Sequence, residues 1–384
     1  MQTAHNQDST RVGSTLAVSL ELAGTSWKLA LQDDSRERPA VHNVSEEHLS
    51  ARFGHLCDHI EATKRKWRLA EPVRVVVMYE AGQDGFWIYR ALTDAGYEAY
   101  VVDPASIPVE RHARRAKTDR LDALRLLSCL RGWLRGECNR MHPVRVPSPE
   151  AEALRHLARE RGQLQKEIGQ HRDRIRKLLR TVGCSTEVDA TFGRRLDQGE
   201  LRGHGNAPLP DELRERLQRE CDRMELAQRQ FRELEASLPK QLPERVRDGM
   251  KRLQRLRGVG DVGACRLMLE LFWRRFDNRR QVGSCVGLVP QPYDSGQSRI
   301  DQGISKQGNR RVRALLIEMS WMWLRHQPNS DLARWYAQHA GSSKRSRRIA
   351  IVAVARRLVI ALWRYLADGV LPKGGELKPA KRLA

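Results

Sequence analysis

Four carboxylates occupy positions that suit a metal-dependent reaction at a phosphate. Glu21 lies in an apolar segment that alternates like a strand, and Glu80 ends a second apolar segment. Asp119 and Asp122 lie three residues apart in Lys-Thr-Asp-Arg-Leu-Asp-Ala (117–123), where a helix is predicted to begin. Mg²⁺ prefers oxygen ligands, and two such ions about 4 Å apart stabilise both the attacking and the leaving oxygen of a phosphodiester displacement. The four acids therefore predict a site for Mg²⁺, with two ions, that acts on a nucleic-acid backbone.

Each acid also has a simpler explanation when it is taken alone. Glu21 is explained as a solvent-facing strand residue, and Asp119 as a first-turn acid favoured by the helix dipole. However, Ala17 and Ser19 share the strand face of Glu21 and are small, which leaves room for a cation and a phosphate. Glu80 stands at the carboxyl end of a strand, where α/β sheets place their ligands. The combination favours the metal site.

A hydroxyl-bearing loop in the C-terminal part is the second candidate site. Asp294-Ser295-Gly296 on its own is best explained as a tight turn. It is followed by a glycine-containing loop whose cations open a predicted helix, and these are Lys306, Arg310, Arg311 and Arg313. A hydroxyl beside such cations can attack a phosphate if its proton is removed and the developing charge is neutralised. No His or Lys base stands obviously beside Ser295 in the sequence.

The charge is distributed unevenly along the 384 residues. The chain has a formal net charge of +22, and residues 251–384 hold 27 Lys and Arg against 9 Asp and Glu, a net +18. A basic excess confined to one end is typical of a protein that binds a polyphosphate. The simpler alternative is a cationic, soluble surface. The densest basic run, predicted to contact DNA or RNA, contains Lys344, Arg345, Arg347 and Arg348.

Alternating strands and helices must position the four acids. Residues 16–31 alternate as a strand pair with a turn at 24–26. Further elements are predicted as helices at 46–67, 85–95 and 119–134 and as strands at 73–79 and 99–102. This order predicts an α/β layer fold that contains a mixed sheet.

From Ser148 the pattern changes to long helices. Leucines and other apolar residues recur with coiled-coil periodicity in two stretches, which a Gly- and Pro-containing connection near 183–210 interrupts. Arg161 and His171 occupy two positions of the predicted seam. The two helices form either a hairpin that packs on itself or a spacer and oligomerisation arm, and the pattern does not separate these alternatives.

The C-terminal region is predicted to be mainly helical. Gly258 and Gly260 lie between two predicted helices, an arrangement like a helix-hairpin-helix in which backbone N–H groups face a phosphate. A plain turn between two core helices is the alternative. Residues 310–369 are expected to form two or three helices with the basic run between them, and the last dozen residues are expected to fray.

The composition also indicates a compartment. Seven cysteines, an odd number without a Cys-x-x-Cys pair, favour free thiols in a reducing environment. The N-terminus does not resemble a signal peptide, and no apolar segment approaches the roughly 20 residues that span a bilayer. A cytoplasmic protein without membrane contact is predicted.

Several of these segments resemble a family of bacterial insertion-sequence transposases. The N-terminal matches are Tyr-Glu-Ala-Gly-Gln-Asp-Gly-Phe-Trp (79–87), Val-Asp-Pro-Ala-Ser-Ile-Pro (102–108) and residues 117–123. The C-terminal matches are the Gly-Val-Gly hairpin, Gly-Leu-Val-Pro, Asp-Ser-Gly and Ile-Ser-Lys-Gln-Gly-Asn-Arg-Arg-Val-Arg, in that order. The family is that of the DEDD transposases of the insertion sequence one-ten type, related to the Piv/MooV DNA invertases.

The resemblance implies a domain order and a mechanism. It implies a RuvC-like, RNase H-type catalytic domain at 1–147, a coiled-coil linker or oligomerisation arm at 148–245, and a C-terminal transposase domain at 246–384. Its catalytic residues would be Glu21, Glu80, Asp119 and Asp122 as metal ligands and Ser295 as the nucleophile that forms a covalent phosphoserine intermediate. It further implies a homo-oligomer, a dimer or tetramer, and a bridge noncoding RNA that pairs with insertion-end and target DNA.

One position departs from the family pattern. The family begins its acidic set with Asp, whereas this chain has Glu21, and Asp33 and Asp34 are alternative candidates for that ligand. Two other functions stay open on the residues alone. One is a Holliday-junction-type nuclease that uses water as its nucleophile, and the other is a non-catalytic nucleic-acid-binding protein with a degenerate RNase H-like domain.

Overall fold

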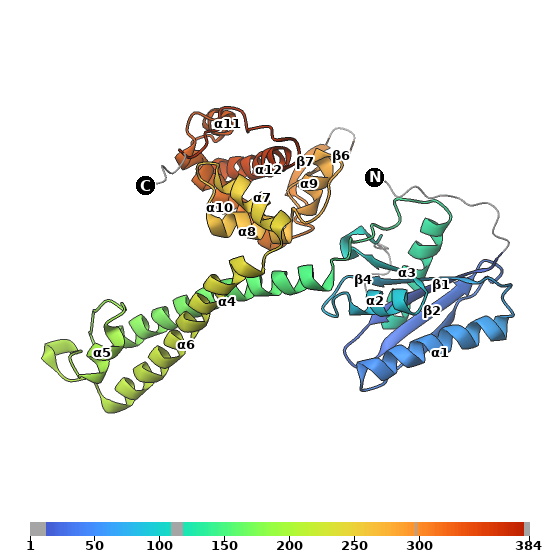
Figure 1. Cartoon of the computed structure of the whole chain (residues 1–384), viewed down its shortest axis with the longest axis horizontal. Coiled ribbons are helices and arrows are strands. Elements are labelled where there is room, and N and C mark those ends of the chain that lie inside the picture. The colour runs from blue at the N-terminus through green and yellow to red at the C-terminus, as the bar shows by residue number, and fades with distance from the viewer. Residues whose placement is uncertain (1–12, 109–117, 296–297, 380–384) are drawn as a thin grey trace. The chain divides into compact units, whose positions relative to one another are not determined.

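The chain divides into two compact units. A computed structural model describes residues 13–108, 118–295 and 298–379, and the units are Met1–Pro147 and Ser148–Ala384 (Figure 1). The helical arm and the C-terminal helices belong together in the second unit.

The first unit is built on a five-stranded mixed sheet in the order β3-β2-β1-β4-β5. Its strands are β1 (Thr15–Leu22), β2 (Trp27–Asp33), β3 (Ala40–Val44), β4 (Arg74–Glu80) and β5 (Glu98–Val102). β1, β4 and β5 run parallel, whereas β2 and β3 pair antiparallel. The predicted hairpin and mixed sheet are confirmed. The edge strand β3 was missed because it is short and mostly half-buried, so its pattern is weak.

Helices cover both faces of this sheet. α1 (Leu49–Trp67) and α2 (Trp87–Asp94) pack on the face that contains Leu16, Val18 and Leu20. α3 (Asp119–Leu134) packs on the opposite face, over small and apolar side chains that include Ala17 and Ala30. A short 3₁₀ turn, η1 (Pro104–Ser106), follows β5. The mixed sheet with helices on both faces agrees with the predicted α/β layer fold.

Two long helices form the arm of the second unit. α4 (Pro149–Thr181) and α6 (Asp211–Gln241) pack side by side along much of their length (Figure 1). Leu164, Ala227 and Leu234 share one buried cluster between them. The predicted helices are therefore confirmed, and within this chain they pack on each other.

The polar residues of the predicted seam find partners across the helix pair. Arg161 contacts Glu235 at 2.5 Å, and the His171 ring lies 2.6 Å from Glu220. Burial would raise the pKa of Glu220, but the hydrogen bond from His171 and the charges of Arg174 and His171 outweigh it and leave the pKa lowered.

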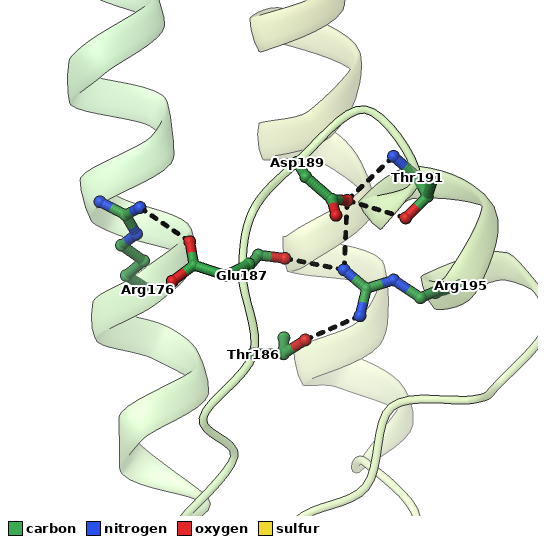
Figure 2. A network of polar contacts seen from close by, with 6 residues as sticks. All are labelled: Arg176, Thr186, Glu187, Asp189, Thr191 and Arg195. Carbon is green, nitrogen blue, oxygen red and sulfur yellow. Dashed lines mark hydrogen bonds and ion pairs between the residues drawn. The ribbon is translucent and has the colours of Figure 1, made fainter.

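The connection at the tip of the arm is folded, which the sequence did not predict. It contains α5 (Phe192–Asp197) and a 3₁₀ turn, η3 (His204–Asn206), and Phe192 and Leu196 are buried against both long helices. Figure 2 shows Arg195 donating hydrogen bonds to Thr186, to the carbonyl of Glu187 and to Asp189. Because these bonds tie the loop to α5, the tip has a defined structure of its own.

The remainder of the second unit is helical apart from one hairpin. The helices are α7 (Glu244–Gln254), α8 (Asp261–Glu270), α9 (Arg279–Cys285), α10 (Arg310–His326), α11 (Asp331–His339) and α12 (Lys344–Asp368). The strands β6 (Pro290–Ser295) and β7 (Ser298–Ile304) form the hairpin. Buried residues of α7, α8, α10 and α12 share one core, as Leu253, Leu267, Leu316 and Leu358 do.

Two expectations for this region were wrong. The basic run lies in the first turns of α12 instead of between helices, because Ser343 caps the helix just before it. The segment before residue 380 was expected to fray, but it packs against the segment that follows α7. Lys378 donates its backbone N–H to the carbonyl of Arg255 at 2.7 Å, and Leu377 bridges to Leu256.

The described helices include none that is both long and apolar enough to cross a membrane. All seven cysteines are free thiols, as predicted.

Candidate functional site

The register of the parallel strands places Glu21 and Glu80 at one edge of the sheet. Leu20 of β1 pairs with Tyr79 of β4, and each glutamate is the next residue along its strand. Both glutamates are half-buried. Side chains alternate along a strand, so Glu21 shares its face with Ser19, on the side that α3 covers. The strands therefore carry the first two acids at neighbouring carboxyl ends.

The start of α3 carries the other two acids. Thr118 caps the helix and accepts a hydrogen bond from the backbone N–H of Leu121 at 3.3 Å, which explains why the helix begins at Asp119. Asp119 is exposed, whereas Asp122 is buried with 8% of its surface accessible. Asp122 is paired with Arg125 at 2.9 Å. Of this motif, Lys117 lies outside the described residues.

A buried hydrogen bond fixes α3 against the strand that carries Glu21. The Ser19 hydroxyl donates to the backbone carbonyl of Ala123 at 2.7 Å. Ser19 lies two residues before Glu21 in β1, and Ala123 follows Asp122 in α3. Burial raises the pKa of the Cys129 thiol in α3, and the negative charge of Glu80 raises it further. The hydrogen bond thus holds the start of α3 against β1, and the pairing of β1 with β4 places the two strand ends side by side.

The four carboxylates do not converge on one point. Among the residues that the structure describes, no three His, Cys, Asp or Glu side chains form a group that could hold a metal ion. Asp122 is engaged by Arg125, and Glu21 and Glu80 each take part in a further polar or electrostatic interaction. Like-charged carboxylates repel when no cation lies between them. Their donor chemistry and backbone placement nevertheless fit a divalent cation.

Asp33 and Asp34 lie elsewhere. Asp33 pairs in register with Leu16, five residues before Glu21, which is about 17 Å along the strand. Its carboxylate accepts a hydrogen bond from Ser35 at 2.8 Å. Asp34 lies 3.7 Å from Arg131 and its side chain is 80% exposed. Glu21 is thus the candidate beside Glu80.

Two of the C-terminal motifs form one interlocked loop pair. The N–H groups of Ser305, Lys306 and Asn309 donate to the carbonyls of Val289, Gly287 and Cys285 at 2.9, 3.1 and 3.0 Å. Gly287 and Gly308 have positive φ, and a Cβ on either would meet backbone atoms of the facing loop at 2.3 Å or closer. Lys306 also has positive φ, 56°, although it has a Cβ. Such strain, about 1 kcal/mol or more, often marks a functional loop.

This loop pair supports the hairpin that carries Ser295. Ser295 ends β6 and pairs in register with Ser298 of β7, so it stands where the hairpin turns. Gly296 and the side chains of Asp294 and Ser295 lie outside what the structure describes. The predicted turn is thus part of a two-stranded projection.

The cations that follow open α10. Asn309 caps this helix by accepting hydrogen bonds from the backbone N–H groups of Arg311 and Val312 at 3.0 and 3.2 Å. Lys306, Arg310 and Arg311 are exposed. Arg313 is half-buried and donates to the carbonyl of Val286 at 3.1 Å, and desolvation lowers its pKa. With no acid in its first turn, this helix end is strongly positive.

A buried ion pair behind this helix end was missed from the sequence. Glu270 of α8 accepts two hydrogen bonds from Arg159 of α4, at 2.8 and 3.0 Å, and one from the side chain of Asn309 at 3.1 Å. Burial would raise the pKa of Glu270, but these hydrogen bonds outweigh it and leave the pKa lowered. Asn309 therefore links the arm to the helix that carries the cations. No local pattern predicts this contact, because its members are 39 and 111 residues apart.

The glycine hairpin between α7 and α8 is partly covered. Gly258 has positive φ, and its Cα lies close to α10 because a Cβ would be 3.2 Å from the carbonyl of Met322. Gly260 caps α8. The N–H of Arg257 donates to the carbonyl of Glu376 at 3.1 Å, and the Lys378 ammonium donates to the carbonyl of Val259 at 2.8 Å. These contacts support a packing role for the hairpin beside its predicted phosphate role.

The basic run is exposed at the start of α12. Lys344, Arg345, Arg347 and Arg348 are all solvent-accessible. Arg347 donates to the carbonyl of Ser342 at 2.8 Å. This helix end is also strongly positive.

Two family models match separate parts of the chain. The family described as DEDD "Transposase" matches residues 37–183, and "Transposase IS116/IS110/IS902 family" matches residues 250–335. Glu80, Asp119 and Asp122 fall within the first match and Ser295 within the second. Glu21 lies before both.

Curated relatives match most of the chain. "Putative transposase y4rJ" of Sinorhizobium fredii is 38% identical over 379 residues, which is 94% of each chain. "Probable family 20 transposase" of Pseudomonas aeruginosa is 26% identical and covers 77% of this chain and 85% of its own. "Transposase for insertion sequence element IS1111A" of Coxiella burnetii is 25% identical, covering 77% and 78%.

Proposed function

This chain belongs to the IS116/IS110/IS902 family of transposases, and from that premise we propose that it cuts and rejoins DNA at insertion-sequence ends and targets with a serine nucleophile. Transposases in general cleave and transfer DNA strands, and the DEDD family implies dependence on a divalent metal. The observation that carries the proposal is that the ends of β1 and β4 lie side by side and that the start of α3 is hydrogen-bonded to β1. These three positions bear Glu21, Glu80 and Asp122.

The acidic residues would orient the scissile phosphate through Mg²⁺. When bound, two ions polarise the phosphate and stabilise the oxygens that enter and leave. The ions would be held by Glu21, Glu80, Asp119 and Asp122. To bind a metal ion, the Asp122 carboxylate would give up its ion pair with Arg125. Glu21 stands where the family has its first aspartate. It keeps the carboxylate group on a side chain that is longer by one methylene.

Ser295 would supply the nucleophile. Its Oγ forms a bond to phosphorus while the bond from phosphorus to one deoxyribose oxygen breaks. The serine proton passes to a base, and the leaving oxygen takes up a proton. Lys306, Arg310 and Arg311 stand on the loop and helix that follow the hairpin, where their charge would offset the charge that develops on the phosphate.

Joining reverses the same step. The deoxyribose hydroxyl of another strand attacks the phosphoserine, forms a new phosphodiester and releases Ser295. The bond count is conserved, so no external energy source is needed.

Partners complete the proposal. A homo-oligomer, a dimer or tetramer, would bring acidic residues and Ser295 to one phosphate, within one chain or between two. A bridge RNA would supply sequence recognition by base pairing, which fits a basic chain without an obvious base-reading motif.

The test is a cleavage reaction analysed after denaturation. Full-length protein with its co-purified RNA is incubated with labelled insertion-end DNA and Mg²⁺, and a protein–DNA adduct is mapped by mass spectrometry. The proposal expects an adduct at Ser295 that is absent from Ser295→Ala. Free nicked DNA from Ser295→Ala would instead establish the water-using nuclease. Salt-dependent binding without any cleavage would establish the non-catalytic binding protein.

A further inference from the structure

The second unit contains a wide, open groove of about 1270 Å³ beside the serine hairpin. Its walls come from α9, the base of the β6–β7 hairpin, α11, α12 and the segment after α12. Pro290, Gly303 and Ile304 bring the hairpin into the wall. All of these elements belong to one compact unit.

The floor of the groove is apolar. α12 has two apolar stripes, and its core stripe buries residues such as Val354, Leu358 and Leu362. The second stripe, with Ile349, Val352 and Ile360, lines the groove, and Val352 and Ile360 also pack against the edge of the core. Ile349 is 58% exposed, which is unusual for an isoleucine in a well-packed unit. A floor of this kind is suited to flat apolar groups.

The rim of the groove is strongly basic. Ten Lys or Arg side chains line it against one acid, Asp331, and Asp331 is already paired with Arg334. The ten are Arg279, Arg280, Lys306, Lys344, Arg345, Arg348, Arg356, Arg357, Arg364 and Lys373. Within the described part of the chain, none of the ten has a carboxylate within ion-pair distance. These charges repel one another, so the groove favours a polyanion.

We infer that this groove binds single-stranded DNA, with phosphates on the basic rim and base faces on the apolar floor. A duplex presents phosphates and groove edges but keeps its base faces stacked inside, so it would leave the floor uncovered. An unpaired strand offers one charge and one flat base per nucleotide, which matches the alternation of cations and apolar side chains along α12.

The place of Ser295 favours DNA as the strand. Ser295 is five residues along β6 from Pro290 in the groove wall, a span of about 17 Å. A strand held on Ser295 can therefore continue into the groove after only a few nucleotides. This step rests on the proposed function, whereas the charge and shape of the groove do not.

Binding of short nucleic acids tests the inference without catalysis. Fluorescence anisotropy of the full-length protein is measured without Mg²⁺ on a 20-nucleotide oligo-dT, a 20-base-pair duplex and an oligo-U of the same length. The inference expects oligo-dT to bind more tightly than either of the others. Duplex or RNA binding at least as tight as oligo-dT binding would overturn it.

Two variants separate the floor from the rim. Ile349→Gln keeps the charge and alters an exposed side chain, so oligo-dT binding should weaken about five- to tenfold while duplex binding stays unchanged. Arg348→Gln should weaken oligo-dT binding and lower the slope of log affinity against log salt by about 0.7. Arg325→Gln is the matched control, because Arg325 is exposed on α10 and does not line the groove.

Each variant result bears on the inference. An Ile349→Gln protein with wild-type affinity for oligo-dT would contradict the apolar floor, and an Arg325→Gln protein as defective as Arg348→Gln would contradict the groove itself. Ser295→Ala should keep the oligo-dT preference. If the adduct forms normally while the preference is absent, the groove inference fails alone. If the preference is present while no adduct forms, the proposed function fails alone.

Discussion

The two candidate centres of this protein are carried by very different supports. Glu21 and Glu80 project from β1 and β4, the inner strands next to one another in a five-stranded sheet with helices on both faces. Ser295 ends a strand of a two-stranded hairpin. An inner strand is hydrogen-bonded on both sides, whereas a lone hairpin is fixed mainly at its base. The backbone positions of Glu21 and Glu80 are therefore held firmly, whereas the hairpin is suited to bring Ser295 to a bound strand.

Removing one acid should have the largest effect. Asp122→Asn should lower Mg²⁺-dependent adduct formation at least about 10³-fold, because a neutral amide is a poor ligand for Mg²⁺. Chelation of Mg²⁺ by EDTA should do the same to the unaltered protein. Quenched-flow gels measure both effects. Asp34→Asn, on a side chain that is 80% exposed, is the control and should retain activity. Activity in Asp122→Asn above a tenth of the unaltered level would contradict the assignment.

The next effect distinguishes the two ends of the sheet. Glu21→Gln should reduce adduct formation about 10²-fold or more, because it removes a carboxylate beside Glu80. Asp33 of β2 pairs with Leu16, about 17 Å from Glu21 along β1, so Asp33→Asn should cost folding stability and leave the rate within about threefold. Rates are measured below the melting temperature of both variants. If Asp33→Asn slowed adduct formation more than Glu21→Gln, Asp33 would be the metal ligand and Glu21 would not.

A third prediction concerns the support behind the cations. Asn309→Asp retains the oxygen that caps α10 but places a second carboxylate against Glu270. It should lower the free energy of unfolding of the second unit by about 1–3 kcal/mol, since a buried acceptor loses its donor. Asn309→Ser keeps a cap without the charge and should be milder. Denaturant titrations measure the free energy of unfolding of both variants. If Asn309→Asp were as stable as Asn309→Ser or more stable, the role given to Glu270 would be contradicted.

The smallest effect is a dependence of stability on pH. Arg159 and Asn309 hold the pKa of Glu270 below its ordinary value, so the folded state binds this proton less readily than the unfolded chain. Its contribution to stability is thus fully present above about pH 4.3 and is lost as the pH falls through the lowered pKa. Melting curves between pH 3 and 6 should show this loss. Glu270→Gln should flatten the curve, and an unchanged slope would refute the link.

The strand and helix patterns in the sequence predicted much of the fold. α3 begins at Asp119 as predicted, since Thr118 and the acids after it are a strong N-terminal signal. β3 and α5 were missed because each is short, and α5 depends on the distant residues Leu217 and Met224 for its core. Local periodicity holds no information about such partners.

The candidate site was predicted only in part. The order of the acids and the serine could be read from their motifs, yet the Arg125 ion pair and the Arg159–Glu270–Asn309 contact depend on side-chain packing between elements. The docking of Lys378 on the Gly258 hairpin was missed for the same reason. A polar, terminal segment gives no sign in sequence of the surface that will bind it.

The central claim is that the carboxylates of the first unit and Ser295 act on the same phosphorus. A single phosphorothioate at the phosphate that becomes attached to Ser295 tests it directly, because sulfur binds Mg²⁺ poorly and Mn²⁺ better. The account predicts that one phosphorothioate isomer slows adduct formation in Mg²⁺ and that Mn²⁺ restores the rate. If both phosphorothioate isomers and the unmodified DNA formed the adduct at equal rates in Mg²⁺, the claim would be contradicted.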